Sequence, residues 1–228
     1  MGAARVLCDI RGCATRYTNR TDRIANGLRK TYEGPGARKR ARAEYVALMG
    51  LAGRMPVPAV LERSDVAVVI EFIEGTHGQD EIDAGHGAEV LSSCGALLRR
   101  VHDLDPALVG SSCSAGVICH GDFGPNNVLL DPATYEVAAL LDWEFCGVGK
   151  AIVDVAWCEW IVRMHHPAAA DSLPAFFEAY GARPTWPIRQ QAMLDRCRWL
   201  EALCRQGDDS DGVRLWRDRA QATANWTE

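Results

Sequence analysis

Residues 120–127 of this 228-residue chain read His-Gly-Asp-Phe-Gly-Pro-Asn-Asn, and they carry the strongest signal in the sequence. Apolar residues 117–119 precede this polar stretch and apolar residues 128–130 follow it, which predicts a loop between two short strands. Within the loop, Asp122 and Asn127 have the spacing Asp-x-x-x-x-Asn. The catalytic loop of enzymes that transfer phosphoryl groups from nucleotides places an acid and an amide at this same spacing.

A second predicted strand, at residues 137–141, ends in Asp142 and adds a third oxygen-bearing side chain. Phosphoryl transfer needs one carboxylate that orients the acceptor hydroxyl and takes its proton, and a carboxylate and an amide that hold Mg²⁺ against the phosphates. We therefore expect Asp122 to be the catalytic base, and Asn127 and Asp142 to be the metal ligands. Taken alone, Asp122 and Asn127 would fit a structural turn equally well, because Asn, Gly and Pro favour turns.

Residues 122–124 spell Asp-Phe-Gly, which is the metal-binding tripeptide of protein kinases. Here the tripeptide follows His-Gly and precedes the Asn at the catalytic spacing, so the metal-binding role falls to the later Asp142. His120 is expected to hold the loop in place as a structural residue rather than to act as a general base.

The first part of the chain is expected to be rich in strands, with one helix. The predicted strands are near residues 5–10, 16–24, 27–32, 59–62 and 66–73, and the helix is near residues 37–55, after a turn at 33–36. Pro56 and Pro58 end this helix. Its apolar side carries Tyr45, Leu48, Met49 and Leu51, whereas the basic run at residues 38–42 is expected to form a solvated face.

Lys30 and Glu44 are candidates for the phosphate-binding part of a kinase-like site. Such a site needs a strand lysine on the nucleotide phosphates, paired with a glutamate on the adjacent helix. Lys30 ends a predicted strand and Glu44 lies within the following helix. Because strand residues alternate between faces, only one of Arg29 and Lys30 can face the cleft, and Lys30 is preferred.

The second part of the chain is mainly helical. Helices are predicted near residues 88–104, 152–165, 172–180, 186–205 and 213–226. Trp157 and Trp160 are expected to be core residues, and Glu159 is a candidate for lining a pocket for a cationic acceptor. The expected fold is α+β, with a small β-rich lobe at residues 1–75, a mainly helical lobe at residues 76–228, and a cleft between them.

The composition excludes several other classes. The net charge is −5 without a long run of one sign, which argues against a nucleic-acid partner. The nine cysteines include no Cys-x-x-Cys pair and several lie in apolar segments, which is typical of reduced, buried thiols. No signal-peptide core and no apolar stretch of about 20 residues is present, so a cytoplasmic protein that does not enter a membrane is expected.

Between residues 28 and 160 the sequence resembles the aminoglycoside phosphotransferase family, whose members are relatives of choline kinase with a protein-kinase-like fold. The resemblance rests on the loop at residues 120–127, the Asp-Trp-Glu at residues 142–144 and the segments around Lys30 and Glu44. It implies a linker whose backbone meets the adenine between Glu71 and Ile73. It also implies that Asp154 braces the catalytic loop. The chain departs from the family in its phosphate-covering loop, which is reduced to about residues 12–15.

The resulting expectation is an ATP- and Mg²⁺-dependent phosphotransferase that acts on a hydroxyl of a small molecule. An aminoglycoside-type or other cationic antibiotic is the leading acceptor by resemblance. A metabolic kinase for an amino alcohol or a sugar derivative, and a non-catalytic nucleotide-binding module, are the alternatives. A monomer is the default expectation for the oligomeric state.

Overall fold

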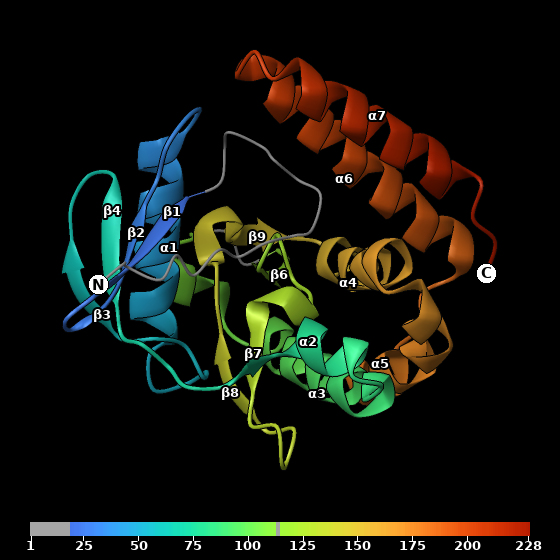
Figure 1. Ribbon diagram of the computed structural model, residues 1–228, viewed down its shortest axis with the longest axis horizontal. Coiled ribbons are helices and arrows are strands. Elements are labelled where there is room, and N and C mark those ends of the chain that lie inside the picture. Colours follow the sequence, from blue (N-terminus) through green and yellow to red (C-terminus); the bar gives the residue numbers. More distant parts are fainter. Residues whose placement is uncertain (1–18, 113–114) are drawn as a thin grey trace.

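The computed structural model describes residues 19–112 and 115–228 (Figure 1). A small sheet packed on one helix forms the first lobe, and a larger, mainly helical lobe follows, as the sequence predicts. The strand expected near residues 5–10 and the loop expected at residues 12–15 lie outside the described residues.

The first lobe is built on a four-stranded antiparallel sheet. Its strands lie in the order β1 (Arg20–Ile24), β2 (Gly27–Thr31), β4 (Ala67–Ile70) and β3 (Val60–Arg63). The apolar run in β4 is buried, as expected of a central strand. Lys30 lies opposite Val68 in the register, which fixes the face on which its side chain emerges. The sequence placed the end of β4 at residue 73, but the strand ends at Ile70 and an extended linker follows.

Helix α1 (Ala37–Leu51) crosses the sheet and ends four residues before the predicted end at residue 55. Ala52 leaves the helical region and Gly53 has a φ of +71°, so the chain turns away before Pro56 is reached. Leu48 and Leu51 are buried as expected. Met49, expected on the same apolar side, is 54% exposed, because the buried stripe of the helix passes through Glu44, Ala47, Leu48 and Leu51 instead.

Two small sheets carry the loop at residues 120–127. Strand β7 (Val128–Leu130) pairs with β5 (Thr76–His77) on one side and with β8 (Val137–Leu140) on the other, while β6 (Val117–Cys119) pairs with β9 (Gly147–Gly149). Short 3-10 turns at Pro125–Asn127 and Trp143–Phe145 connect these strands to the site. The sequence pattern missed β5 and β9, because segments of two or three residues are too short to show alternation.

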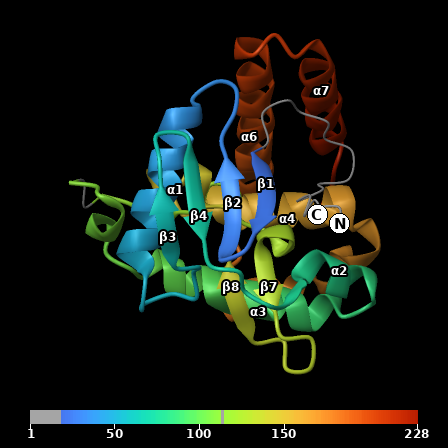
Figure 2. The same cartoon turned by 60° about the vertical axis from the view of Figure 1, so that its left-hand side comes forward.

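Helices form the rest of the second lobe. They are α2 (Gly78–Asp83), α3 (Gly87–His102), α4 (Ile152–His165), α5 (Leu173–Tyr180), α6 (Trp186–Gln206) and α7 (Ser210–Ala224), with further 3-10 turns at Pro106–Val109 and Pro167–Ser172. Helices α6 and α7 form a hairpin that rises beside α4 (Figure 2). Gly95 allows α3 to pack closely on α5, because a Cβ at this position would lie 2.2 Å from the carbonyl oxygen of Phe176.

The buried apolar residues form two clusters. The larger one joins α1 and the sheets to α3, α4 and α5, and the smaller one joins α4 to the α6–α7 hairpin through Trp157, Trp160 and Trp216. Six cysteines in the described ranges are free thiols, and five of them are buried, as the composition predicted. Across residues 19–112 and 115–228, no helix combines the length and apolar character needed to cross a bilayer.

Candidate active site

Asp154, in the first turn of α4, holds the loop that contains Asp122. Its carboxylate is fully buried and accepts hydrogen bonds from the backbone N–H groups of His120 and Gly121, both at 2.8 Å. His102 Nε2 lies 3.2 Å from the same carboxylate, and His102 Nδ1 lies 2.9 Å from the hydroxyl of Tyr180 on α5. Helices α3, α4 and α5 therefore all contribute to the position of the loop.

His120 is a structural residue of the loop. Its side chain is fully buried, its Nε2–H donates to the carbonyl oxygen of Leu141 at 2.8 Å, and its Nδ1 accepts the backbone N–H of Asp122 at 3.2 Å. Both ring nitrogens are engaged in tying the loop to the end of β8. Neither nitrogen is available to take a proton from a bound substrate.

The Asp122 carboxylate is held in one orientation by two donors. Trp157 Nε1–H donates to Oδ1 at 2.8 Å, and the side-chain amide of Asn127 donates to Oδ2 at 3.1 Å. The same amide nitrogen also donates to the backbone carbonyl of Asp122 at 2.8 Å. Asp122 is half-buried and remains in contact with open space, so its carboxylate is both oriented and reachable.

Lys30 links the first lobe to the second. Its Nζ lies 2.6 Å from Glu44 Oε2 on α1 and 2.8 Å from Asp142 Oδ1 at the end of β8. Of the adjacent residues Arg29 and Lys30, Lys30 is buried, as preferred from the sequence. Arg29 is exposed and lies 4.0 Å from Glu62. Lys30, Glu44 and Asp142, which are far apart in the sequence, thus meet in one cluster.

Each charged group of this cluster lies beside a group of opposite charge. Burial lowers the pKa of Lys30, but the neighbouring Asp142 and Glu44 carboxylates outweigh it and hold this pKa well above its ordinary value. Burial likewise raises the pKa of Asp142, yet the Lys30 ammonium outweighs this effect and holds it below its ordinary value. Asp142 therefore stays ionised. It occupies the left-handed region (φ 66°), which places its side chain at a sharp change in chain direction.

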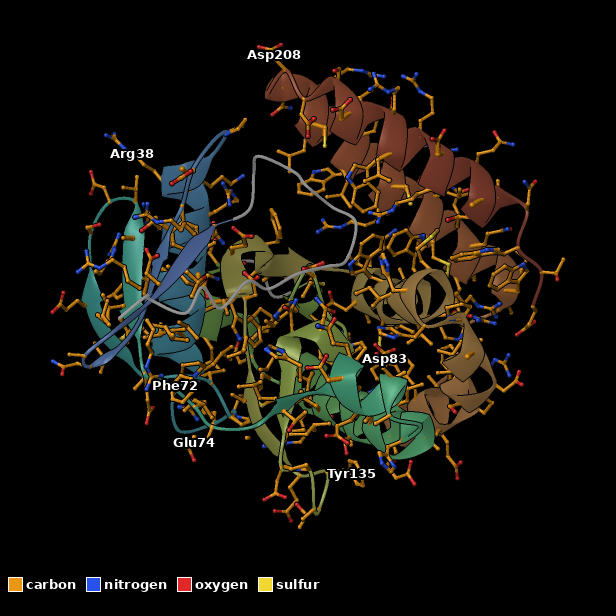
Figure 3. The ribbon with its side chains drawn as sticks, viewed as in Figure 1. Arg38, Phe72, Glu74, Asp83, Tyr135 and Asp208 are labelled. Carbon is orange, nitrogen blue, oxygen red and sulfur yellow. The ribbon has the colours of Figure 1, made fainter. Side chains whose placement is uncertain are left out.

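Arg40 corrects one prediction from the sequence. The basic run at residues 38–42 was expected to be a solvated face, and Arg38 (Figure 3) is indeed exposed. Arg40, however, is buried, and its guanidinium pairs with Glu144 at 2.5 Å and donates to the carbonyl of Glu33. The charge pattern could not reveal this because the partner lies 104 residues away. Burial, together with the Asp142 charge, raises the pKa of Glu144 to about 7.

A cavity of about 320 Å³ opens beside Asp122 between α2, α4 and α7. Its walls include the indoles of Trp157, Trp160 and Trp216, and the first two stack with ring centroids 4.3 Å apart. These tryptophans are buried core residues, as expected, but they also form the wall of the cavity. Asn126 lines the same space, is 3% exposed, and has no hydrogen-bond partner for either polar atom of its side chain.

The acidic residues divide into two groups. Glu159, a candidate for binding a cationic acceptor, is fully buried and pairs with Arg189 at 2.6 Å and with Arg163 at 2.9 Å, so it is a structural residue of the core. Asp80 and Asp83, on α2, line the cavity instead. Asp83, labelled in Figure 3 where α2 approaches α4, lies 2.8 Å from His166 Nδ1.

The segment expected to meet adenine is the extended linker between β4 and β5. Glu71 N–H donates to the carbonyl of Ala59 at 2.8 Å, and Ile73 is half-buried in the same linker. Phe72, which Figure 3 labels together with Glu74 along this connection, packs under the Arg23 guanidinium at 3.5 Å.

The sequence did not predict the roles of four residues: Trp157 as a donor to Asp122, Arg40 as an ion-pair partner, Asn126 as a cavity residue, and Arg196 as a cation packed against Trp157. Trp157 follows Asp154 by one helical turn, so an indole facing the loop could have been anticipated. The other three depend on contacts between distant segments, which no local pattern encodes.

Part of the sequence is similar to known phosphotransferases. Residues 112–200 match the phosphotransferase enzyme family (APH), a range that includes the loop, Asp142 and α4. Over 71 residues the chain is 39% identical to an aminoglycoside 3'-phosphotransferase of Streptomyces fradiae. This match covers 29% of the chain, and it spans only about a quarter (25%) of the length of that curated relative.

Solved structures share the fold along nearly the whole chain. The GDP complex of wild-type aminoglycoside 2'-phosphotransferase-IIIa superimposes with a TM-score of 0.70 at 9% identity, covering 93% of this chain and 91% of that one. The complex of gentamicin with APH(2")-IIa gives a TM-score of 0.66 at 11% identity, covering 90% and 88%. The fold is the two-lobed, kinase-like fold of these enzymes, while the match to the phosphotransferase enzyme family covers residues 112–200 of the chain.

Proposed function

We propose that this chain is an ATP-dependent phosphotransferase that moves the γ-phosphoryl group onto a hydroxyl of a small molecule. The observation that carries the proposal is the Asp122 carboxylate, which is oriented by Trp157 and Asn127 and opens onto a cavity. An oriented carboxylate beside a pocket is what an acceptor hydroxyl needs as its base. Asp122 accepts the hydroxyl proton as the oxygen attacks the phosphorus atom.

Residues from both lobes form the proposed nucleotide site. Lys30, held by Glu44, contacts the phosphates, and the linker between Glu71 and Ile73 meets the adenine with its backbone. We accordingly assign residues 1–75 to the nucleotide-binding lobe and residues 76–228 to the lobe that carries the catalytic and acceptor residues. The pairing of Lys30 with Glu44 supports this arrangement, because it positions the ammonium group at the junction of the two lobes.

Asn127 and Asp142 are the proposed Mg²⁺ ligands. Asp142 is an ionised carboxylate, and the amide nitrogen of Asn127 is directed to Asp122, so its side-chain oxygen is the atom it can offer a cation. One carboxylate and one amide suit Mg²⁺, which takes its other ligands from phosphates and water. When bound, the ion would neutralise charge on the phosphates.

The cavity supports an acceptor that carries both rings and polar groups. Indole walls fit the apolar faces of sugar rings, while Asp80 and Asp83 suit ammonium groups. The amide of Asn126 offers both a donor and an acceptor for hydroxyl or amino groups. Because the structural neighbour APH(2")-IIa was solved with gentamicin, an aminoglycoside-type or other cationic antibiotic is the proposed acceptor class. Such an acceptor needs neither a nucleic acid nor a membrane, and we propose that the chain acts as a monomer in the cytoplasm.

The test is a nucleotide titration followed by an acceptor screen. ATP, GTP and ADP are titrated by calorimetry with and without Mg²⁺, and ATP consumption is then measured with aminoglycosides, macrolides, choline and amino sugars. Mg²⁺-dependent nucleotide binding together with phosphorylation of an aminoglycoside supports the proposal. Turnover of choline or a simple amino sugar alone would show a metabolic kinase instead. Nucleotide binding that is indifferent to Mg²⁺, with no turnover, would contradict the enzyme function.

A further inference from the structure

Arg196, on α6, is a half-buried cation whose guanidinium packs among aromatic rings. Its guanidinium carbon lies 4.2 Å from the ring centroid of Trp199, 5.2 Å from that of Phe145 and 5.5 Å from that of Trp157. Two of these rings belong to the reaction centre. Phe145 follows the proposed metal ligand Asp142 by three residues, and Trp157 donates to Asp122. Arg196 therefore lies where the segments carrying the base and the metal ligand meet.

The hydrogen-bonding state of Arg196 distinguishes it from the buried arginines Arg40 and Arg189. Arg40 and Arg189 each form a short ion pair, with Glu144 and Glu159 respectively. Arg196 forms no ion pair within residues 19–112 and 115–228, and its Nε, although buried, has no hydrogen-bond partner. A buried donor without a partner has a free-energy cost of about 1–3 kcal/mol, more for a charged group, which a bound anion would remove.

Burial and the nearby carboxylates have opposite effects on the pKa of the Arg196 guanidinium. Burial lowers the pKa of Arg196 below its ordinary value, and among the charges that oppose this effect Asp122 is the largest. Guanidinium groups nevertheless remain protonated in proteins, so Arg196 presents a permanent positive charge near the base. Stacking against three aromatic rings holds this charge in place without neutralising it.

We propose that Arg196 binds the phosphoryl group during transfer, with its guanidinium donating to the equatorial phosphoryl oxygens. This inference rests on the proposed function. In the reaction the bond from phosphorus to the oxygen bridging it to ADP breaks, and its electron pair stays on ADP. The acceptor oxygen forms the new bond to phosphorus and its proton passes to Asp122. Arg196 exchanges no proton or electron, and it stabilises charge on the transferring group.

A binding role for an anionic group of the acceptor and a purely structural role are the competing explanations. They differ in the kinetic constant that they affect. A group that contacts only the transferring phosphoryl lowers kcat and leaves both KM values nearly unchanged. An acceptor-binding group raises the KM of the acceptor, and a structural group lowers the thermal stability.

The experiment compares Arg196→Met and Arg196→Lys with Arg198→Met, a matched control on the same helix whose arginine is exposed and pairs with Asp195. We expect kcat to fall about 100-fold or more in Arg196→Met, with both KM values within about threefold of the wild type. Added guanidinium should restore part of the activity of Arg196→Met but not of an Asp122 variant. Arg198→Met should behave as the wild type.

A second measurement is independent of turnover. In the wild type, aluminium fluoride should tighten the binding of Mg²⁺–ADP, because it mimics the transferring phosphoryl group, and this tightening should be lost in Arg196→Met while binding of Mg²⁺–ADP alone persists. A fully active Arg196→Met, or one changed only in acceptor KM or melting temperature, would overturn the assignment of Arg196 while leaving the phosphotransferase function intact. A wild type that neither binds Mg²⁺–ADP nor turns over would instead overturn both proposals.

Discussion

The two halves of the proposed active site differ in how completely their polar groups are paired. In the cluster of Lys30, Glu44 and Asp142, every charge has an opposite charge within 2.8 Å. In the cavity beside Asp122, the Asn126 amide is buried and has no partner. The nucleotide half is therefore organised before any ligand arrives, whereas the acceptor half contains groups that a ligand must satisfy.

This difference separates two tasks of a phosphotransferase. Nucleotide phosphates have the same shape in every reaction, so the residues that receive them can be fixed by ion pairs. Acceptors differ in shape, and a cavity with aromatic walls and unsatisfied polar atoms is selective only when a ligand supplies the missing partners. Substitutions in each half can test whether nucleotide binding and acceptor binding are separate in this way, beginning with the proposed base Asp122.

Asp122→Asn should have the largest effect. The substitution keeps the shape of the side chain but removes the group that takes the hydroxyl proton, so kcat should fall by about 1,000-fold or more while nucleotide affinity stays close to that of the wild type. The measurement is ATP- and acceptor-dependent turnover alongside calorimetric titration. Asp171→Asn, at an exposed position, is the control. Retained turnover in Asp122→Asn would show that another residue is the base.

Lys30→Met should affect the nucleotide half and leave acceptor binding unchanged. The substitution leaves the buried Glu44 and the half-buried Asp142 without their cation, so the free energy of unfolding should fall by about 3 kcal/mol. The ratio kcat/KM for ATP should fall about 100-fold. Chemical denaturation and steady-state kinetics measure the two effects.

Arg29→Met is the matched control for Lys30→Met, because Arg29 is the adjacent residue on the exposed face of β2. It should change neither quantity appreciably. Equal losses in the two variants would mean that the substitutions disturb the strand rather than the ion pair.

Asn126→Leu should change stability and acceptor binding in opposite directions. Removing a buried amide that has no partner should raise the free energy of unfolding by about 1 kcal/mol, while loss of its hydrogen bond to the acceptor should raise the acceptor KM about tenfold. The KM for ATP should not change. Asn225→Leu, at an exposed site, serves as the control. An unchanged acceptor KM would remove Asn126 from the proposed acceptor site.

Glu144→Gln should change the free energy of unfolding in a way that depends on pH. The folded pKa of Glu144, about 7, lies above its ordinary value of 4.5. Its contribution to stability is therefore complete below about pH 4.5 and is lost as the pH rises through about 7, because the folded state binds the additional proton. Between about pH 5 and 7.5 the free energy of unfolding of the wild type should fall by about 2 kcal/mol relative to Glu144→Gln. Parallel stability curves would show that the carboxyl group is not perturbed.

Local sequence signals predicted most of the fold. The boundaries of α4 agree with the prediction to the residue, since its N-terminus carries an aspartate and its apolar residues continue to His165. Gly53 ended α1 earlier than Pro56 and Pro58 indicated, because a glycine at positive φ is sufficient to redirect the chain. Strands β5 and β9 could not be predicted, because each depends on a partner strand elsewhere in the chain.

Candidate site residues could be predicted where their spacing in the sequence is typical of a reaction type. The loop at residues 120–127 offered Asp122 and Asn127 as candidates and strand order offered Asp142, and in the structure Asn127 contacts Asp122 while Asp142 pairs with Lys30. Arg40 and Arg196 could not be assigned in the same way, because a charged residue on a helix has the same sequence pattern whether it faces water or a distant partner. Only the packing of α1 against the turn after β8, and of α6 against α4, distinguishes the two cases.

The hydrogen bonds of Asp154 with His102, and of His102 with Tyr180, anchor the loop at residues 120–127 through α3, α4 and α5. Helices α3, α4 and α5 form an inner frame that keeps the reaction geometry, and the hairpin is an outer attachment that supplies part of the cavity wall. Residues of α7 that line the cavity can then be remodelled for a new acceptor while the frame is kept, provided that Arg196 on α6 is retained.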